Sequence, residues 1–533
     1  MNTFLALVAI IIFCCVLLNN ASHKVGIPVL LAFILLGIFV GNVDFINIAL
    51  EDFKAAEKMC SIALIFIMFY GGFGTRWKTA RPVAAQAAIL ATAGVAVTAG
   101  VTGLFCHFVL HWNWLESMLM GAVISSTDAA SVFSILRSKN LGLKNGTSPL
   151  LEMESGSNDP MSYMLTALML SLMGGSASGA GIAMMLLKQI VLGAGIGYLI
   201  ARGAILVMRR ISFATAGFDS LFVLAIALFS YAVPGLLGGN GYLSAYIVGI
   251  ILGNTDFRGR KSLVHFFDGI TGLMQVLIFF ALGLLAQPEA LLKAALPAAA
   301  IFLCLLFISR PASVFSVLPF FKRFDLHQQS FISFVGLRGA ASIVFAITAT
   351  LGAGQIEHDI FSTVFVIVLI SIALQGSLIP LAARKMDVID PEADAKTFFN
   401  DFAEQADLQF HSMSVTTESP WAGKTVKELG LDKGTIICML IRADGSRLIP
   451  NGDSRVDAGD SLILCSKEFR ERVGVNIIER EIRKESKWNG HMVRDYPCET
   501  NQQLLMIKRK DTTIIPHGDT ILQAGDILYI NKG

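Results

Sequence analysis

Long apolar segments occupy most of the first 385 residues of this 533-residue chain. A helix needs about 20 mainly apolar residues to cross the hydrocarbon of a bilayer. The whole chain is 54% hydrophobic and only 15% charged, which excludes a purely water-soluble protein. We predict thirteen transmembrane helices, at residues 3–19, 26–41, 59–74, 83–106, 115–136, 150–174, 181–208, 216–237, 241–253, 270–286, 289–309, 329–350 and 359–383.

Lys and Arg residues gather in every second loop between these segments. One set of loops carries sixteen of them, and the other set has only Lys54, Lys58 and Lys293. Because basic loops stay in the cytoplasm, we expect an N-terminus outside the cytoplasm, retained as a first span, and a cytoplasmic C-terminal tail. The basic residues form no stripe of the kind that binds nucleic acid, so the expected surroundings are the lipid bilayer.

Cysteine and histidine residues give no sign of a metal centre or of an enzyme. The eight cysteines include no CxxC pair, and five of them lie in apolar segments. We expect reduced structural thiols. The nine histidines are scattered and no nucleophile motif is present, so neither a catalytic residue nor a cofactor is predicted.

A few charged residues fall inside the predicted spans. Lys188 and Arg202 are close enough to a span end to extend towards the interface. Arg310 and Arg338 are not, and Arg338 lies in the middle of the twelfth segment, within GLRGA (336–340). A charge at such a position is typical of a functional or paired residue.

The acidic residues of the sixth segment lie in LEMESGSNDP (151–160). Helical spacing places Ser155 and Asp159 on one face, and Pro160 frees the carbonyl of Gly156. Together with Asn158 they offer the oxygen ligands that hard cations accept. Burial disfavours the charged form of a carboxylate, so one group could hold a cation or a proton in turn. That competition is the chemistry of antiport.

Two further acidic residues are interpreted by the same reasoning. Asp128 lies at the centre of the fifth segment, in SSTDAAS (125–131), and is a second candidate for ion binding. A buried carboxylate can also serve only to pair with a buried arginine and fix helix packing. We prefer that interpretation for Glu154, with Arg310 as its partner.

A short internal repeat favours a transporter over a channel. DAASVF (128–133) and GAASIVF (339–345) fall in the fifth and twelfth segments, which run in opposite directions. Inverted repeats with polar, interrupted helices are typical of alternating-access carriers. Chance similarity between Ala- and Ser-rich helices is the alternative.

The chain resembles the sodium/proton exchanger class of cation:proton antiporters, the CPA1 family. Four motifs carry this resemblance in combination: SSTDAAS, ESGSNDP, the SRP at residues 309–311 and GLRGA. The resemblance covers residues 1–385. It implies an all-α membrane domain of thirteen spans with inverted repeats, an NhaA-like fold with crossed unwound helices, and a homodimer. It also implies that Asp159 carries the monovalent cation or the proton, and that Ser155 and the Thr127 region complete its shell. Asn158 stands where a second aspartate could be, which implies electroneutral exchange. The resemblance further implies that Glu154 and Arg310 form a structural ion pair. It implies that Arg338 is a functional arginine in the unwound helix.

The last 148 residues have the charge content of a soluble domain, with 19 Lys and Arg against 24 Asp and Glu. After a linker at 386–402, alternating apolar residues between Gly and Asp turns predict a small α+β or β-rich tail. IPNGDSRVDAGDSLIL (449–464) recurs as IPHGDTILQAGDILYI (515–530). The first copy, at 403–485, resembles the RCK-C (TrkA-C) module, and 486–533 is a degenerate second repeat. The resemblance implies regulation by a nucleotide or ion, and it favours K⁺ as the transported cation.

The function expected from these features is exchange of K⁺, or else Na⁺, for H⁺ by a secondary transporter of the bacterial inner membrane. Such a protein would serve pH and volume homeostasis. A strict Na⁺/H⁺ exchanger is one alternative. A ligand-gated cation channel is another, although the sequence has no carbonyl-lined filter such as TVGYG.

Overall fold

The structure is a computed structural model, and its described part falls into two compact units, residues 1–404 and 405–533. The described residues are 9–18, 29–41, 53–139, 141–175, 179–210, 217–255, 260–321, 323–354, 356–390, 408–417, 419–431, 435–444, 446–467, 476–482, 484, 486–496, 502–509, 512–514 and 516–532.

The first unit is helical in its described residues. Eight helical runs there are long and apolar enough to cross a membrane, and four shorter apolar helices accompany them. Each of the thirteen predicted segments overlaps a described helix, while the number of spans remains a prediction. The helices are Ala9–Leu18, α2 Val29–Gly41, α3 Phe53–Gly74, α4 Trp77–Ala80, α5 Ala84–Ile89, α6 Val95–Phe108, α7 Trp114–Ile124, α8 Ala129–Ser138, α9 Thr147–Met173, α10 Gly179–Arg210, α11 Phe218–Leu236, α12 Gly241–Gly253, α13 Arg260–Leu285, α14 Pro288–Cys304, α15 Arg310–Val317, α16 Leu326–Phe334, α17 Ala340–Gly352, α18 Ile360–Ile370 and α19 Gly376–Lys385.

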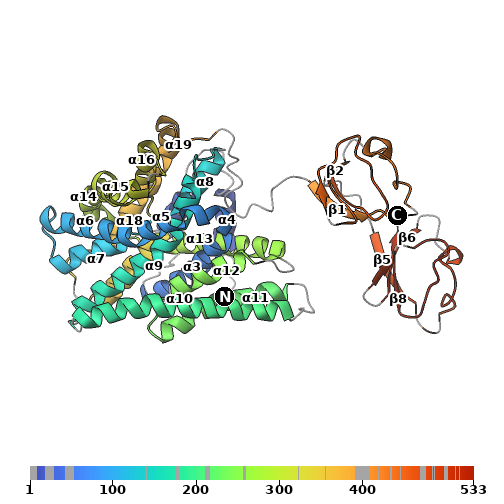
Figure 1. The fold of residues 1–533 in the computed structure, drawn as a ribbon. Helices are drawn as coiled ribbons and strands as arrows, with labels where there is room; N and C mark the ends of the chain where they lie inside the picture. Colours follow the sequence, from blue (N-terminus) through green and yellow to red (C-terminus); the bar gives the residue numbers. More distant parts are fainter. Residues whose placement is uncertain are drawn as a thin grey trace. The chain divides into compact units, whose positions relative to one another are not determined.

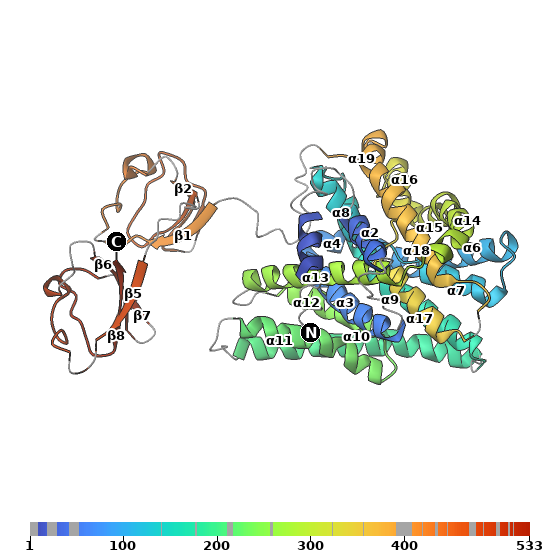
Figure 2. The same cartoon turned by 180° about the vertical axis from the view of Figure 1, so that it is seen from behind.

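These helices gather in two groups. One group packs α2, α3 and α10 to α13 together, and the other contains α5 to α9 and α14 to α19 (Figures 1 and 2). Small residues allow close approach within the first group: a Cβ atom on Gly249 of α12 would lie 2.1 Å from the carbonyl oxygen of Phe69 in α3. The second group carries both interrupted helices.

Two helices are broken at matching places, as predicted. The chain is not helical between α7 and α8 or between α16 and α17. The breaks lie against each other, because the backbone N–H of Asp128 donates to the carbonyl of Leu337 at 2.8 Å. A Cβ atom on Gly339 would lie 2.6 Å from the Cβ of Asp128, so only glycine fits there. The crossed, unwound helices expected from the resemblance are confirmed.

The second unit contains two antiparallel four-stranded sheets with the same topology. Their strand orders are β1-β4-β2-β3 and β5-β8-β6-β7. The central pairing has an irregularity at the same place in each, between Ile437 and Met439 and between Leu504 and Met506. The sequence repeat is thus a structural repeat, and the β-rich tail is confirmed. The strands are β1 Leu408–Ser414, β2 Thr435–Ile441, β3 Arg447–Leu448, β4 Ser461–Lys467, β5 Asn476–Glu481, β6 Gln502–Arg509, β7 Thr512–Ile514 and β8 Asp526–Lys532.

Candidate ion-binding site

Asp159 lies in the middle of α9, against the break between α7 and α8. Its side chain is only 6% exposed. The hydroxyl of Ser126, in the broken segment, donates a hydrogen bond to its carboxylate. The carboxylate is therefore held at the crossing of the two interrupted helices.

Asn158 and Ser155 connect α9 to Thr127 in the same break. The Asn158 amide donates to the Thr127 hydroxyl at 2.6 Å, and the Ser155 hydroxyl donates to the Thr127 carbonyl at 2.8 Å. Ser155 in turn accepts from the backbone N–H of Ala129 at 2.9 Å. These bonds satisfy backbone groups that the interruption leaves without helical partners. The structure thus brings Asp159, Asn158, Ser155 and Thr127 together.

Asp128 occupies the start of α8. Its carboxylate accepts from the backbone N–H of Ser131 at 3.2 Å and from the hydroxyl of the same residue. This is the geometry of an N-cap, in which a negative charge meets the positive end of the helix dipole. Asp128 therefore has a local structural role, and it also lines the same cavity as Asp159.

The cavity has a volume of about 1050 Å³ and reaches both carboxylates. α2, α3 and α13 of the first helix group contribute to its walls, as do α8, α9 and α17 of the second. Its polar lining is Tyr70, Ser126, Thr127, Asp128, Ser131, Ser134, Glu152, Ser155, Asp159, Asp268, Thr271 and Gln275. The carboxylate of Asp159 therefore faces a space large enough to hold many water molecules.

α12 supports α9 where Pro160 interrupts its hydrogen bonding. The Asn240 side chain caps α12 and also donates to the Pro160 carbonyl at 2.9 Å. The ring of Tyr246 covers Gly156, where a Cβ atom would lie 2.4 Å from the ring. Sequence reasoning did not identify these two supports from α12.

Glu154 of α9 and Arg310 of α15 form a buried ion pair. Arg310 donates to both carboxylate oxygens, at 2.6 and 2.9 Å, and the two residues are 1% and 4% exposed. The charge of Glu154 is thus balanced by Arg310. Asp159 has no such counter-charge among the described residues, where its carboxylate accepts a hydrogen bond only from the neutral hydroxyl of Ser126.

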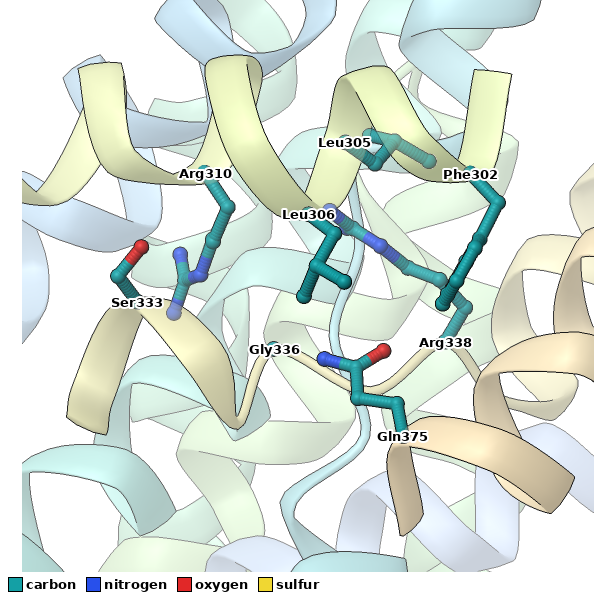
Figure 3. A pocket seen from close by; sticks show the side chains of 8 residues that line it. All are labelled: Phe302, Leu305, Leu306, Arg310, Ser333, Gly336, Arg338 and Gln375. Atoms are coloured by element: carbon teal, nitrogen blue, oxygen red, sulfur yellow. The ribbon is translucent and has the colours of Figure 1, made fainter. Parts of the chain in front are cut away.

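Arg338 lies in the extended segment between α16 and α17. Its side chain runs towards the helix that carries Leu306 and Arg310, and lines a cavity of about 10 Å³ with Gln375 (Figure 3). Its guanidinium donates to the Ser126 carbonyl at 2.7 Å and forms no ion pair within the described chain. Arg338 thus fixes the backbone of the residue whose hydroxyl contacts Asp159. Ser126 was not singled out from the sequence, although it belongs to SSTDAAS.

Comparison with known proteins identifies the family. Residues 8–385 match the family described as sodium/hydrogen exchanger, transmembrane. The chain belongs to this family. It is a cation/proton antiporter, and both halves of its tail, residues 410–470 and 477–530, match the TrkA-C domain.

Individual relatives and solved structures extend the comparison. The K⁺/H⁺ antiporter NhaP2 of Shewanella sp. (strain MR-4) is 34% identical over 477 residues, covering 88% of this chain and 82% of the relative. The K⁺/H⁺ antiporter NhaP of Alkalimonas amylolytica is 34% identical over 470 residues, covering 87% and 81%. The sodium proton antiporter MjNhaP1 from Methanocaldococcus jannaschii has the same fold, with a TM-score of 0.62 and 24% identity over 70% of this chain and 98% of that one.

Proposed function

We propose that this antiporter exchanges K⁺, in preference to Na⁺, for H⁺ across the bacterial inner membrane. The observation that carries the proposal is the buried carboxylate of Asp159, which lines a large cavity where the interrupted helices cross and lies close to hydroxyl and carbonyl oxygens. The preference for K⁺ rests on the relatives of 34% identity, which are K⁺/H⁺ antiporters by name.

In the proposed mechanism Asp159 holds the cation and the proton alternately. When the carboxylate is charged, it and the oxygens of Ser126, Thr127 and Ser155 replace water around a dehydrated cation. When a proton binds, the negative charge is lost and the cation leaves. The neighbouring Asn158 is neutral, so one charge enters for each charge that leaves. This supports electroneutral, one-for-one exchange.

Alternating access is supported by the arrangement on the far side of Asp159. There the rings of Tyr163 and Tyr242 are 5.1 Å apart, and Phe345 lies within 6.0 Å of both. Nearby, the Thr348 hydroxyl donates to Glu57 at 3.0 Å, which links α17 to α3. These contacts join the two helix groups where the cavity does not reach. Their separation would open the site to the opposite side.

The cavity is proposed to open to the cytoplasm, because its lining residues lie near the helix ends that adjoin the basic loops. These are the last part of α3 and the first parts of α2 and α9. Positive loops mark the cytoplasmic side. The tail is then cytoplasmic too, and we propose that a nucleotide or an ion acts on it to regulate a homodimer.

Reconstitution into liposomes tests the proposed function. A proton gradient is imposed, a pH-sensitive dye reports its loss, and K⁺ or Na⁺ is added at matched ionic strength. We expect dequenching at lower K⁺ than Na⁺ concentrations, no effect of a membrane potential, and no exchange by an Asp159→Asn variant. A response to Na⁺ alone would indicate a strict sodium exchanger, and current without proton movement would indicate a channel.

A further inference from the structure

A polar stripe on α13 lines the cavity outside the site described above. α13 is apolar over most of its 26 residues, and Asp268 is its only acidic residue. Asp268, Thr271 and Gln275 are three and four residues apart, which places them on one helix face. All three line the cavity. These three polar residues of α13 thus line the same space as Asp159.

α9 presents a second polar stripe to the same space. Glu152, Ser155 and Asp159 follow the same spacing and line the cavity as well. Glu152 precedes Asp159 by about 10 Å along the helix axis, and Asp268 precedes Gln275 by a similar length. On each helix the outer carboxylate lies nearer the first residue of the helix. The two stripes together form a polar path along the cavity wall.

Thr271 gives independent evidence for a ligand at the outer end of this path. Its side chain is 8% exposed, and its hydroxyl has no hydrogen-bond partner among the described residues. A buried hydroxyl without a partner is costly, and such groups are normally satisfied by water or by an ion. One turn earlier, Asp268 accepts a hydrogen bond from the Tyr70 hydroxyl of α3 at 3.4 Å.

We propose that Asp268 and Thr271 form an outer site at which a partly hydrated monovalent cation binds before it reaches Asp159. The proposal rests on the proposed function, because it takes the cavity to be the cation path. A carboxylate and a hydroxyl on one helix turn replace part of the hydration shell, and Gln275 offers the next oxygen inward.

The outer site affects how readily the cation is captured. A carboxylate exposed in a cavity with low-dielectric walls raises the local cation concentration. The cation moves on to Asp159 without exchanging a proton at Asp268, so the one-for-one coupling is unchanged. Removing this charge should therefore change the KM for the cation more than kcat.

Transport kinetics of the full-length protein test this assignment. Exchange is measured against K⁺ concentration in liposomes, with choline holding the ionic strength constant, for Asp268→Asn, Thr271→Val and the control Asp219→Asn. Asp219 also lies in the early part of an apolar helix, α11, but it does not line the cavity. We expect KM to rise about five- to tenfold for Asp268→Asn and less for Thr271→Val, with kcat within about twofold. An unchanged KM, or a loss confined to kcat, would overturn the proposal.

Direct binding separates this proposal from the proposed function. Tl⁺, an electron-rich substitute for K⁺, is located by anomalous scattering in the wild-type protein and in both Asp268→Asn and Asp159→Asn. We expect one Tl⁺ at Asp159 and another between Asp268 and Thr271, and each variant should lose only its own peak. Tl⁺ at Asp159 alone would overturn the outer site, whereas Tl⁺ at Asp268 without exchange by the wild type would contradict only the proposed function.

Discussion

The ion pair between Glu154 and Arg310 gives a prediction whose size follows from its burial. Replacing Glu154 with Gln leaves the Arg310 guanidinium, 4% exposed, without a counter-charge. Breaking a buried pair in this way costs about 3–5 kcal/mol. Replacing both residues with apolar ones of similar size removes both charges and is neutral or stabilising by about 1–4 kcal/mol. Stability should therefore fall in the single variant and recover in a Glu154→Leu, Arg310→Met double variant.

The free energy of unfolding can be measured by titrating SDS into protein in mild detergent. An Asp387→Asn variant is the control, because its ion pair with Lys144 is 3.0 Å long but has side chains 87% and 33% exposed. We expect that control to lose less than about 1 kcal/mol. The reasoning would be refuted if Glu154→Gln were as stable as the control, or if the double variant were no more stable than Glu154→Gln.

Two further predictions concern the crossing and the tail. Gly339→Ala should lower the exchange rate in liposomes at least about tenfold, because the added Cβ atom would lie 2.6 Å from the Cβ of Asp128. Gly203→Ala is the control: a Cβ atom there has no other atom within 4 Å, so the exchange rate should be unchanged. In the tail, burial raises the pKa of Asp526, but the hydrogen bonds from Arg509 at 2.8 Å, the backbone N–H of Gln523 and the charge of Arg509 together lower it by more, so the pKa is lowered overall. The resulting stability is present above the pKa of the unfolded chain, about 3.9, and is lost as the pH falls through the lower folded-state value. Arg509→Ala should therefore speed hydrogen exchange in β8 of the full-length protein at pH 7, by an amount equivalent to about 1.5–3 kcal/mol. The difference from wild type should shrink as the pH falls below about 3.9; a difference that stays the same down to the lowest pH at which the tail is folded would contradict this.

The residues of the candidate site could be selected from the sequence because they lie close together along the chain. Ser155, Asn158 and Asp159 lie within two turns of α9, and an acidic, amide-rich turn is conspicuous in an apolar segment. The break at Ser125–Asp128 could not be obtained from hydropathy, since residues 115–136 read as one continuous span. It was expected from the resemblance, and the structure gives the reason for it: α9 side chains and Leu337 supply the hydrogen bonds that the helix gives up.

Apart from the pair between Glu154 and Arg310, most contacts between distant segments could not be predicted from the sequence. Nothing in the sequence around Asn240 indicates that its amide meets the carbonyl of Pro160, 80 residues earlier. The position of Asp268 in the cavity wall could not be predicted either. A single acidic residue towards the start of an apolar helix could equally lie at the membrane interface. Only the packing of α13 against the cavity distinguishes the two. In the tail, the repeat was visible at a fixed offset, but the matching strand order of the two sheets required the structure.

The central claim is that a cation and a proton compete for Asp159. The most direct test is to count the protons released when K⁺ is added to weakly buffered, detergent-solubilised protein, at a pH where the site is protonated. The account predicts release of about one proton per chain that binds K⁺ in the wild type, and none in Asp159→Asn. Saturable K⁺ binding without proton release in the wild type, or undiminished release in the variant, would contradict it.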